Sequence, residues 1–231
     1  MHPVTHSHQS VNCHVTLPLS KSIINRLLAI HHFSGGAPIS SLLSESSDTV
    51  AMQNLLKEIS NKSKNTDTIT EINVGNAGTV MRFLTAVLAV SAGKWIITGT
   101  ERMQQRPVKP LTDALQSMGA DIIFQNKPGY PPVLINGNPN LKGGTVKLDA
   151  SISSQFISAM MMLGPALTDG IVIELMGDIT SESYIRMTQA LMQKAGADVS
   201  FNGNIVIVKP GGYKQFDFAS VAEPDWSAAA F

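Results

Sequence analysis

A polar cluster that opens an apolar helix recurs three times along the chain. The copies begin at Ser20, Asn76 and Ser151, and each runs into a stretch whose apolar residues recur every three or four positions. This spacing predicts amphipathic helices with one buried face, and it places Ser22 and Arg26 one turn apart on a different face of the first helix. Copies that start about 55–75 residues apart indicate one supersecondary unit per copy.

A second element, a helix that ends at a glycine and continues as a strand, recurs between these copies. Residues 111–122 align with residues 187–199, which contain one extra residue, and residues 49–59 are a weaker third copy. Gly119 and Gly196 are the expected C-terminal glycines. Strands are predicted over Trp95–Thr98, Ile122–Phe124, Val133–Ile135, Val146–Ala150, Ile171–Met176 and Ile205–Val208, and loops over Ser60–Asp67 and Pro128–Pro132.

These repeats predict an α/β fold of the α+β kind. Residues 17–222 are expected to form one substrate-binding domain of three βαβαββ units, with helices inside and sheets outside, like half of an inverse α/β barrel. Residues 1–16 are expected to be a mobile leader. Residues 223–231 read Glu-Pro-Asp-Trp-Ser-Ala-Ala-Ala-Phe, which is typical of a first helical turn. We therefore expect them to begin a crossover into a second domain that this sequence does not contain.

Composition narrows the classes of function. The 17 basic and 17 acidic side chains balance, which disfavours a nucleic-acid-binding protein because such proteins usually carry a basic excess. No apolar run is long enough to span a bilayer, and the first residues lack the features of a signal peptide. The single cysteine, Cys13, excludes an intrachain disulfide and favours a reducing compartment. We expect a monomeric, cytoplasmic protein without a membrane or nucleic-acid partner.

The three helix starts suit a shared anion site. A helix amino terminus offers unpaired N–H groups and a partial positive charge, and Lys21 and Arg26 add two cations to the first start. Gly78 lets the backbone approach a ligand closely, and Ser153–Gln155 add uncharged donors. Helix capping alone is the alternative interpretation of these clusters. Asp48 is expected either to cap a helix or to pair with a basic site residue.

Five motifs follow one another in a characteristic order. They read Leu17-Pro-Leu-Ser-Lys-Ser-Ile-Ile-Asn-Arg, Gly75-Asn-Ala-Gly-Thr-Val-Met-Arg, Arg102-Met-Gln-Gln-Arg-Pro-Val-Lys-Pro-Leu, Ser151-Ile-Ser-Ser-Gln-Phe and Ser181-Glu-Ser-Tyr-Ile-Arg. In this order they resemble the motifs of 5-enolpyruvylshikimate-3-phosphate (EPSP) synthases, which are enolpyruvyl transferases. From Leu17 onward, nearly the whole chain resembles the amino-terminal domain of this family.

The resemblance implies a 3-phosphoshikimate 1-carboxyvinyltransferase. Such an enzyme transfers the enolpyruvyl group of phosphoenolpyruvate to the 5-hydroxyl of shikimate-3-phosphate and releases phosphate, with no metal or organic cofactor. Two similar domains close over both substrates, and the acidic proton-transfer residues lie in the second. This chain alone is therefore expected to bind shikimate-3-phosphate weakly and to be catalytically inactive.

The resemblance also assigns site residues. Shikimate-3-phosphate would contact Ser22, Arg26, Ser153, Ser154, Gln155, Ser181 and Tyr184, and phosphoenolpyruvate would contact Lys21, Asn76, Gly78, Thr79, Arg106 and Gln155. Ser22 and Arg26 would hold the shikimate carboxylate, and the serines at 153, 154 and 181 its phosphate. Lys21 would be the catalytic residue of this half. No metal ligand is implied.

Five positions depart from the family pattern. Leu19 and Ile24 stand where Gly and Ser are usual, and Phe83 stands where Pro is usual. Phe83 is expected to change the packing of the second helix and, with it, the response to the family's inhibitor glyphosate. Glu182 and Ser183 replace Lys and Pro, so we expect the charge beside the phosphate pocket to be less favourable for an anion.

Two alternative functions are open at this point. One is the sister enzyme that acts on UDP-N-acetylglucosamine, which Ser22, Arg26 and the Arg-Pro-Val-Lys-Pro-Leu segment disfavour. The other is a non-catalytic binding domain of the same fold, which the retained cationic side chains disfavour. A metal site on the histidines before position 15 is disfavoured because no further ligands accompany them at a definite spacing.

Overall fold

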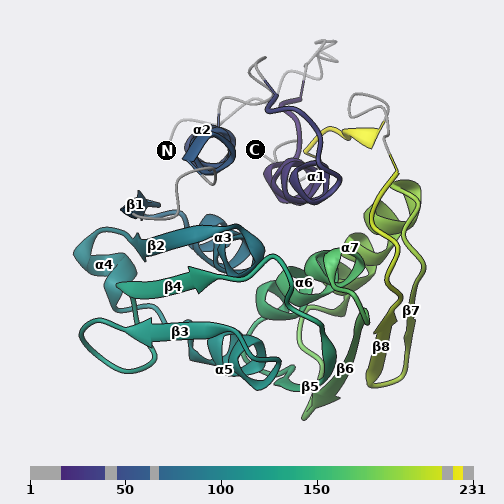
Figure 1. The fold of residues 1–231 in the computed structure, drawn as a ribbon. Coiled ribbons are helices and arrows are strands. Elements are labelled where there is room, and N and C mark those ends of the chain that lie inside the picture. The colour runs from purple at the N-terminus through teal and green to yellow at the C-terminus, as the bar shows by residue number, and fades with distance from the viewer. Residues whose placement is uncertain (1–16, 40–45, 63–67, 215–220, 226–231) are drawn as a thin grey trace, which may run out of the picture.

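The computed structural model describes residues 17–39, 46–62, 68–214 and 221–225 (Figure 1). Its α-helices are α1 (Lys21–Phe33), α2 (Ser47–Lys62), α3 (Gly78–Val90), α4 (Glu101–Gln104), α5 (Lys109–Ser117), α6 (Ser154–Leu163) and α7 (Glu182–Lys194). Its strands are β1 (Ile69–Asn73), β2 (Gly93–Thr98), β3 (Asp121–Phe124), β4 (Val133–Gly137), β5 (Gly144–Asp149), β6 (Ile171–Met176), β7 (Val199–Asn202) and β8 (Ile205–Val208).

The strands form two four-stranded sheets with the same topology. One sheet has the order β1-β2-β4-β3 and the other β5-β6-β8-β7. In each sheet the first two strands in this order are parallel, and the remaining pairs are antiparallel. Each sheet with its connecting helices follows the chain order β-α-β-α-β-β. Two of the three predicted units are therefore complete.

The first predicted unit is represented differently among the described residues. It contributes the helices α1 and α2, but its extended backbone is limited to an isolated bridge between Leu19 and Pro224. The Ser20 N–H donates to the Glu223 carbonyl over 2.9 Å, and the Asp225 N–H donates to the Pro18 carbonyl over 2.7 Å. Residues 223–225, expected to begin a crossover, thus pair with the segment that precedes α1, while residues 226–231 lie outside the described part.

Helices α1, α3 and α6 are largely buried, in agreement with the predicted helical interior. Figure 1 shows α3 and α6 between the two sheets. Nearly every residue of α3 is buried, because its sequence Gly-Thr-Val-Met-Arg-Phe-Leu-Thr-Ala-Val-Leu-Ala-Val is apolar on all sides. The strands instead alternate buried and exposed positions, and their outward isoleucines at positions 69, 123, 205 and 207 are exposed. Each sheet therefore packs one of its faces against a helical core and exposes the other face.

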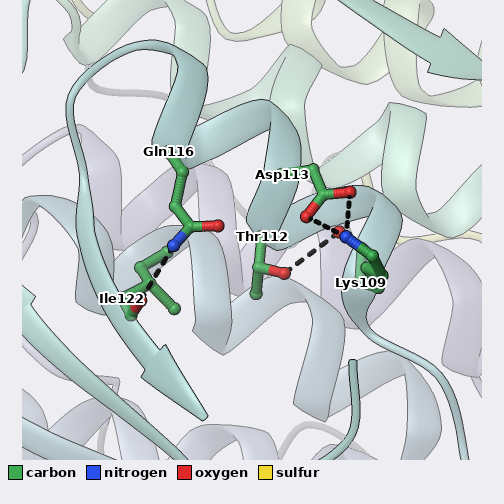
Figure 2. Close-up of polar contacts among 5 residues, drawn as sticks. All are labelled: Lys109, Thr112, Asp113, Gln116 and Ile122. Atoms are coloured by element: carbon green, nitrogen blue, oxygen red, sulfur yellow. Dashed lines mark hydrogen bonds and ion pairs between the residues drawn. The ribbon is translucent and has the colours of Figure 1, made fainter. Parts of the chain in front are cut away.

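The helix–glycine–strand repeat is confirmed at atomic detail. In α5 the Gln116 amide donates to the carbonyl of Ile122 over 2.9 Å, as Figure 2 shows, and in α7 the Gln193 amide donates to the carbonyl of Val199 over 3.0 Å. Each helix is followed by a glycine with positive φ, +94° at Gly119 and +82° at Gly196. The residue after each glycine donates its N–H back into the helix, which satisfies a terminal carbonyl.

The structure corrects two details of the sequence prediction. Strand β1 was not predicted, because its sequence Ile-Thr-Glu-Ile-Asn has only two apolar residues, both isoleucines. Residues 60–62 were predicted as loop but are helical. Polar contacts one turn back stabilise them: the Ser60 hydroxyl donates to the Leu56 carbonyl, and Lys62 pairs with Glu58 over 2.7 Å. Residues 128–132 form the expected loop.

Every helix of the described segments is too short or too polar to traverse a bilayer. Within the same segments, no group of three or more His, Cys, Asp or Glu side chains lies close enough together to hold a metal ion. The histidines before position 15 and Cys13 lie outside the described residues.

Candidate functional site

A polar cleft of about 450 Å³ opens where the amino-terminal ends of several helices meet. Lys21 is the first residue of α1, Ser153 precedes α6, Ser181 precedes α7, and Thr79 lies in the first turn of α3. The full lining consists of Lys21, Ser22, Arg26, Thr79, Ile152, Ser153, Ser154, Gln155, Thr180, Ser181 and Tyr184. The cleft therefore brings together nine of the residues that the sequence motifs pointed to, from four separate helix starts.

Arg26 is held in place by three hydrogen bonds that reach three elements. Its Nε donates to the Thr188 hydroxyl on α7 over 2.7 Å, Nη1 donates to the Ser22 carbonyl over 2.9 Å, and Nη2 donates to the Ser158 hydroxyl on α6 over 3.2 Å. A guanidinium has five N–H donors, so two remain, one on each terminal nitrogen. This pair suits a bidentate contact with a carboxylate or a phosphate.

Arg26 is a buried cation. Only 2% of its surface is exposed, and no carboxylate of the described residues lies within ion-pair distance of it. Burial lowers the Arg26 pKa to about 10, a change that the nearby Tyr184 partly offsets. The side chain still carries its charge at neutral pH. A desolvated charge of this kind is expensive to leave uncompensated, so an anionic ligand at Arg26 would lower the free energy of the site.

Hydroxyl groups and helix ends also line the cleft. The Ser153 hydroxyl accepts from the Gln155 N–H over 3.3 Å and so caps α6. Ser181 has φ = +56°, the left-handed region that a residue with a Cβ seldom occupies. Its position is fixed from the chain before it, where the Thr180 hydroxyl donates to the Ala150 carbonyl over 3.0 Å. Strained backbone of this kind concentrates at ligand-binding positions.

Gln155 is oriented by two residues of α3. Its amide nitrogen donates to the Thr79 hydroxyl over 3.0 Å, and its amide oxygen accepts from Arg82 Nη1 over 3.0 Å. Arg82 Nη1 also donates to the carbonyl of Gly78, whereas the buried Arg82 Nε has no acceptor among the described residues. Burial lowers the Arg82 pKa to about 10, and the neighbouring Arg106 lowers it further. A second uncompensated positive region therefore borders the cleft.

Lys21 forms an ion pair with Asp48. The Lys21 ammonium lies 3.2 Å from a carboxylate oxygen of Asp48, in the first turn of α2. This contact agrees with the prediction of Asp48 as a partner of a basic site residue. About half of the Lys21 side chain is exposed, so it can reach a ligand while Asp48 restrains it.

Three predicted site residues do not line the cleft. A side chain at Gly78 would collide with the Arg106 guanidinium, so this glycine permits a close approach of arginine to the start of α3. Asn76 accepts a hydrogen bond from Thr100, the residue that caps α4. Gly78 and Arg106 thus lie together at the start of α3, beside Arg82, and Asn76 is held just before that helix by Thr100.

The sequence analysis missed Ile152 and Thr180 in the lining, and Ser158 and Thr188 behind Arg26. Ser158 and Thr188 are fully buried, and their hydroxyls lie 2.9 Å apart, so they form a polar pair within an apolar core. Ser158 lies in the apolar helix α6 and Thr188 on the buried face of the amphipathic helix α7, so a single hydroxyl at a core position of each helix was the available signal.

Comparison with known proteins decides the family. The family profile "EPSP synthase (3-phosphoshikimate 1-carboxyvinyltransferase)" matches residues 6–231. The chain belongs to the EPSP synthase family. It is 42% identical over 218 residues to the 3-phosphoshikimate 1-carboxyvinyltransferase of Bacteroides fragilis (strain YCH46), covering 94% of this chain and 50% of that protein. It is 38% identical over 206 residues to that of Photobacterium profundum, covering 82% and 48%.

The EPSP synthase of Acinetobacter baumannii has a similar fold. The structures agree with a TM-score of 0.68 at 21% identity, over 87% of this chain and 47% of the other. The predicted fold class is thus confirmed as that of EPSP synthases. The chain spans about half the length of the curated EPSP synthases it matches.

The structure shows the surroundings of three residues that depart from the EPSP synthase pattern. Ile24 is fully buried in the core and does not line the cleft, and Leu19 forms the bridge to Pro224. The Glu182 carboxylate pairs with Arg186 over 2.6 Å, one turn along α7. Its negative charge is therefore partly neutralised, which lessens the unfavourable effect on an anion that the sequence predicted.

Proposed function

We propose that this chain is the shikimate-3-phosphate-binding half of a 3-phosphoshikimate 1-carboxyvinyltransferase. Arg26 and Ser22 bind the shikimate carboxylate, and Ser153, Ser154 and Ser181 bind its phosphate. Tyr184 lines the pocket, and Gln155 lies between the two substrates. Lys21, Asn76, Gly78, Thr79 and Arg106 bind phosphoenolpyruvate, and Lys21 takes part in proton transfer.

The buried Arg26 is the observation that carries this proposal. Its two remaining N–H donors form a fork at the wall of a cleft, and no carboxylate of the described residues compensates its charge. The serine side chains and helix ends that also line the cleft match a phosphate, which binds N–H and O–H donors at helix amino termini. A ligand with a carboxylate at one end and a phosphate at the other can bind both Arg26 and these serine and helix-end donors.

The side chains of the described residues indicate which steps of the reaction this half of the enzyme contributes. The cleft contains cations and neutral donors, which bind and orient anions. Asp48, the acid nearest to Lys21, is occupied by that ion pair. The acidic groups that move protons are therefore contributed by a second domain, and this half alone does not turn over substrates.

Ligand selectivity tests the proposal. Thermal unfolding of the purified chain is followed with shikimate-3-phosphate, shikimate, inorganic phosphate or UDP-N-acetylglucosamine. Binding to the folded state raises the midpoint, so shikimate-3-phosphate should give the largest increase at equal concentration. An increase with UDP-N-acetylglucosamine alone would instead indicate the sister activity, and no increase with any anion would indicate that the cleft is not an anchor site. Release of phosphate from both substrates by the chain alone would contradict the expected inactivity.

A further inference from the structure

Two aromatic rings lie close to the Arg26 guanidinium. Its central carbon is 5.5 Å from the ring centre of Phe83 on α3 and 5.6 Å from that of Tyr184 on α7. Phe83 is 1% exposed, whereas Tyr184 is 41% exposed and lines the cleft. Tyr184 is thus placed to touch a ligand directly, while Phe83 lines no part of the cleft and reaches a ligand only through Arg26.

An aromatic face suits a buried arginine that must remain available to a ligand. The ring attracts the cation through its quadrupole at distances up to about 6 Å, and the attraction is stronger where water is excluded. A carboxylate would neutralise Arg26 and occupy its donors. A phenyl ring has no hydrogen-bond acceptor of that strength, so it stabilises the charge and leaves the two terminal N–H groups free for an anion.

We propose that Phe83 is a positioning residue for Arg26, and that the ring holds the guanidinium in the orientation that binds the carboxylate of the ligand. This inference rests on the proposed function of the cleft. The other groups around the guanidinium are the Ser22 carbonyl and the hydroxyls of Ser158 and Thr188, which fix its position in the plane of their hydrogen bonds. Phe83 adds a restraint from α3, a neighbouring helix that contributes no hydrogen bond to Arg26.

The position of Phe83 on α3 also links the Arg26 region of the site with the Gln155 region. The preceding residue, Arg82, donates to the Gln155 side chain, so consecutive residues of one helix contact the Arg26 region and the Gln155 region. A side chain without an aromatic ring at position 83 would provide no such face to Arg26.

The test replaces the ring while the volume changes little. The Phe83→Leu variant keeps an apolar side chain but removes the ring quadrupole. A second variant carries 3,4,5-trifluorophenylalanine at position 83, which keeps the shape of the ring but weakens its quadrupole. Phe201→Leu is the matched control, because Phe201 is also a buried phenylalanine beside an arginine, Arg186, that lies outside the cleft lining.

Affinity for shikimate-3-phosphate is measured by calorimetry, and the Arg26 Nε–H signal is recorded by nuclear magnetic resonance without ligand. We expect Phe83→Leu to weaken binding by about 5- to 30-fold, and the trifluorinated variant to fall between Phe83→Leu and the native chain. Phe201→Leu should leave affinity unchanged. Both Phe83 replacements should shift and broaden the Arg26 signal.

The outcomes separate this inference from the proposed function. If the native chain binds shikimate-3-phosphate and fluorination changes neither its affinity nor the Arg26 signal, Phe83 does not position Arg26. If the native chain binds no shikimate-3-phosphate while the Arg26 signal responds to the Phe83 replacements and not to Phe201→Leu, the proposed function fails and the contact between the ring and Arg26 stands. A similar loss of affinity in Phe201→Leu would show a general effect of packing and would overturn the inference.

Discussion

At the scale of single residues, the site is built around charge that the protein leaves uncompensated. Arg26 and Arg82 are buried, and within the described residues neither forms an ion pair. A fold selected only for stability would place an apolar side chain at such positions, since replacing buried charge by apolar groups is often neutral or stabilising. An anionic ligand in the cleft would supply the missing negative charge and lower this cost.

This account predicts opposite effects of Arg26→Met on stability and on binding. The variant removes the buried charge, and the hydroxyls of Ser158 and Thr188 remain paired with each other at 2.9 Å. We expect the free energy of unfolding without ligand to stay equal or to rise by about 1–4 kcal/mol, while binding of shikimate-3-phosphate is lost. Urea denaturation and calorimetry measure the two effects. A strongly destabilised variant would show that Arg26 is primarily structural.

Ser181 gives a second prediction at this scale. Its left-handed backbone, φ = +56°, strains any residue with a Cβ. Ser181→Gly should therefore be more stable than Ser181→Ala by about 1 kcal/mol, and both variants should bind the phosphate less tightly because they lack the hydroxyl. Thermal unfolding of the two variants checks the difference. Equal stability would mean that the backbone strain is not significant.

At the scale of elements, the repeated unit explains how four helix starts meet. The two complete units share strand order, glycine-terminated helices and the glutamine contact that ties each helix to its following strand. Because the units are alike, α3 and α6 direct equivalent amino termini toward the same region. The anion site is thus a consequence of the repeat, with side chains added to each helix start.

The glutamine contacts provide a test of this equivalence. Gln116→Leu and Gln193→Leu each remove one hydrogen bond from a partly exposed position. Each should lower the free energy of unfolding by about 0.5–1.5 kcal/mol, with similar values for both and no change in ligand affinity. Urea denaturation gives the comparison. A large loss at only one position would indicate that the two units are stabilised in different ways.

The sequence was most informative about local elements and least informative about contacts between them. Glycine ends and apolar periodicity located α5 and α7, and the motifs located the cleft residues. The bonds from Arg26 to Ser158 and Thr188 join α1 to residues more than one hundred positions away, and nothing in the local pattern selects those partners. The same holds for the pairing of residues 18–20 with 223–225 and for β1, whose edge position needs few apolar residues.

At the scale of the whole molecule, net charge is zero and the positive region is local. Binding should therefore depend on pH through the site itself. Burial lowers the Arg26 pKa in the folded chain to about 10, so the buried charge destabilises the unliganded fold fully below about pH 10, and this destabilisation declines gradually as the pH rises from about 10 toward the ordinary arginine pKa. Ligand binding instead favours the protonated form of Arg26, because the ligand is an anion.

Affinity for shikimate-3-phosphate should thus rise from pH 5 to 7 as the phosphate, with a second pKa of about 6, gains its full charge. It should then stay level and fall as the pH passes about 10, where Arg26 and Arg82 lose their protons. Titrations across this range, with circular dichroism to verify that the chain stays folded, measure the profile. An affinity that is unchanged from pH 9 to 11 would show that both arginines keep their protons throughout this range.

The most direct measurement is a calorimetric titration of shikimate-3-phosphate into this chain and into its Arg26→Met variant at neutral pH. Our account predicts saturable binding with one site in the native chain and none in the variant, although both are folded. Equal binding to the two chains would place the ligand away from Arg26. A folded native chain that binds nothing would contradict the central claim, that the cleft at the helix starts is by itself an anchor for a carboxylate- and phosphate-bearing ligand.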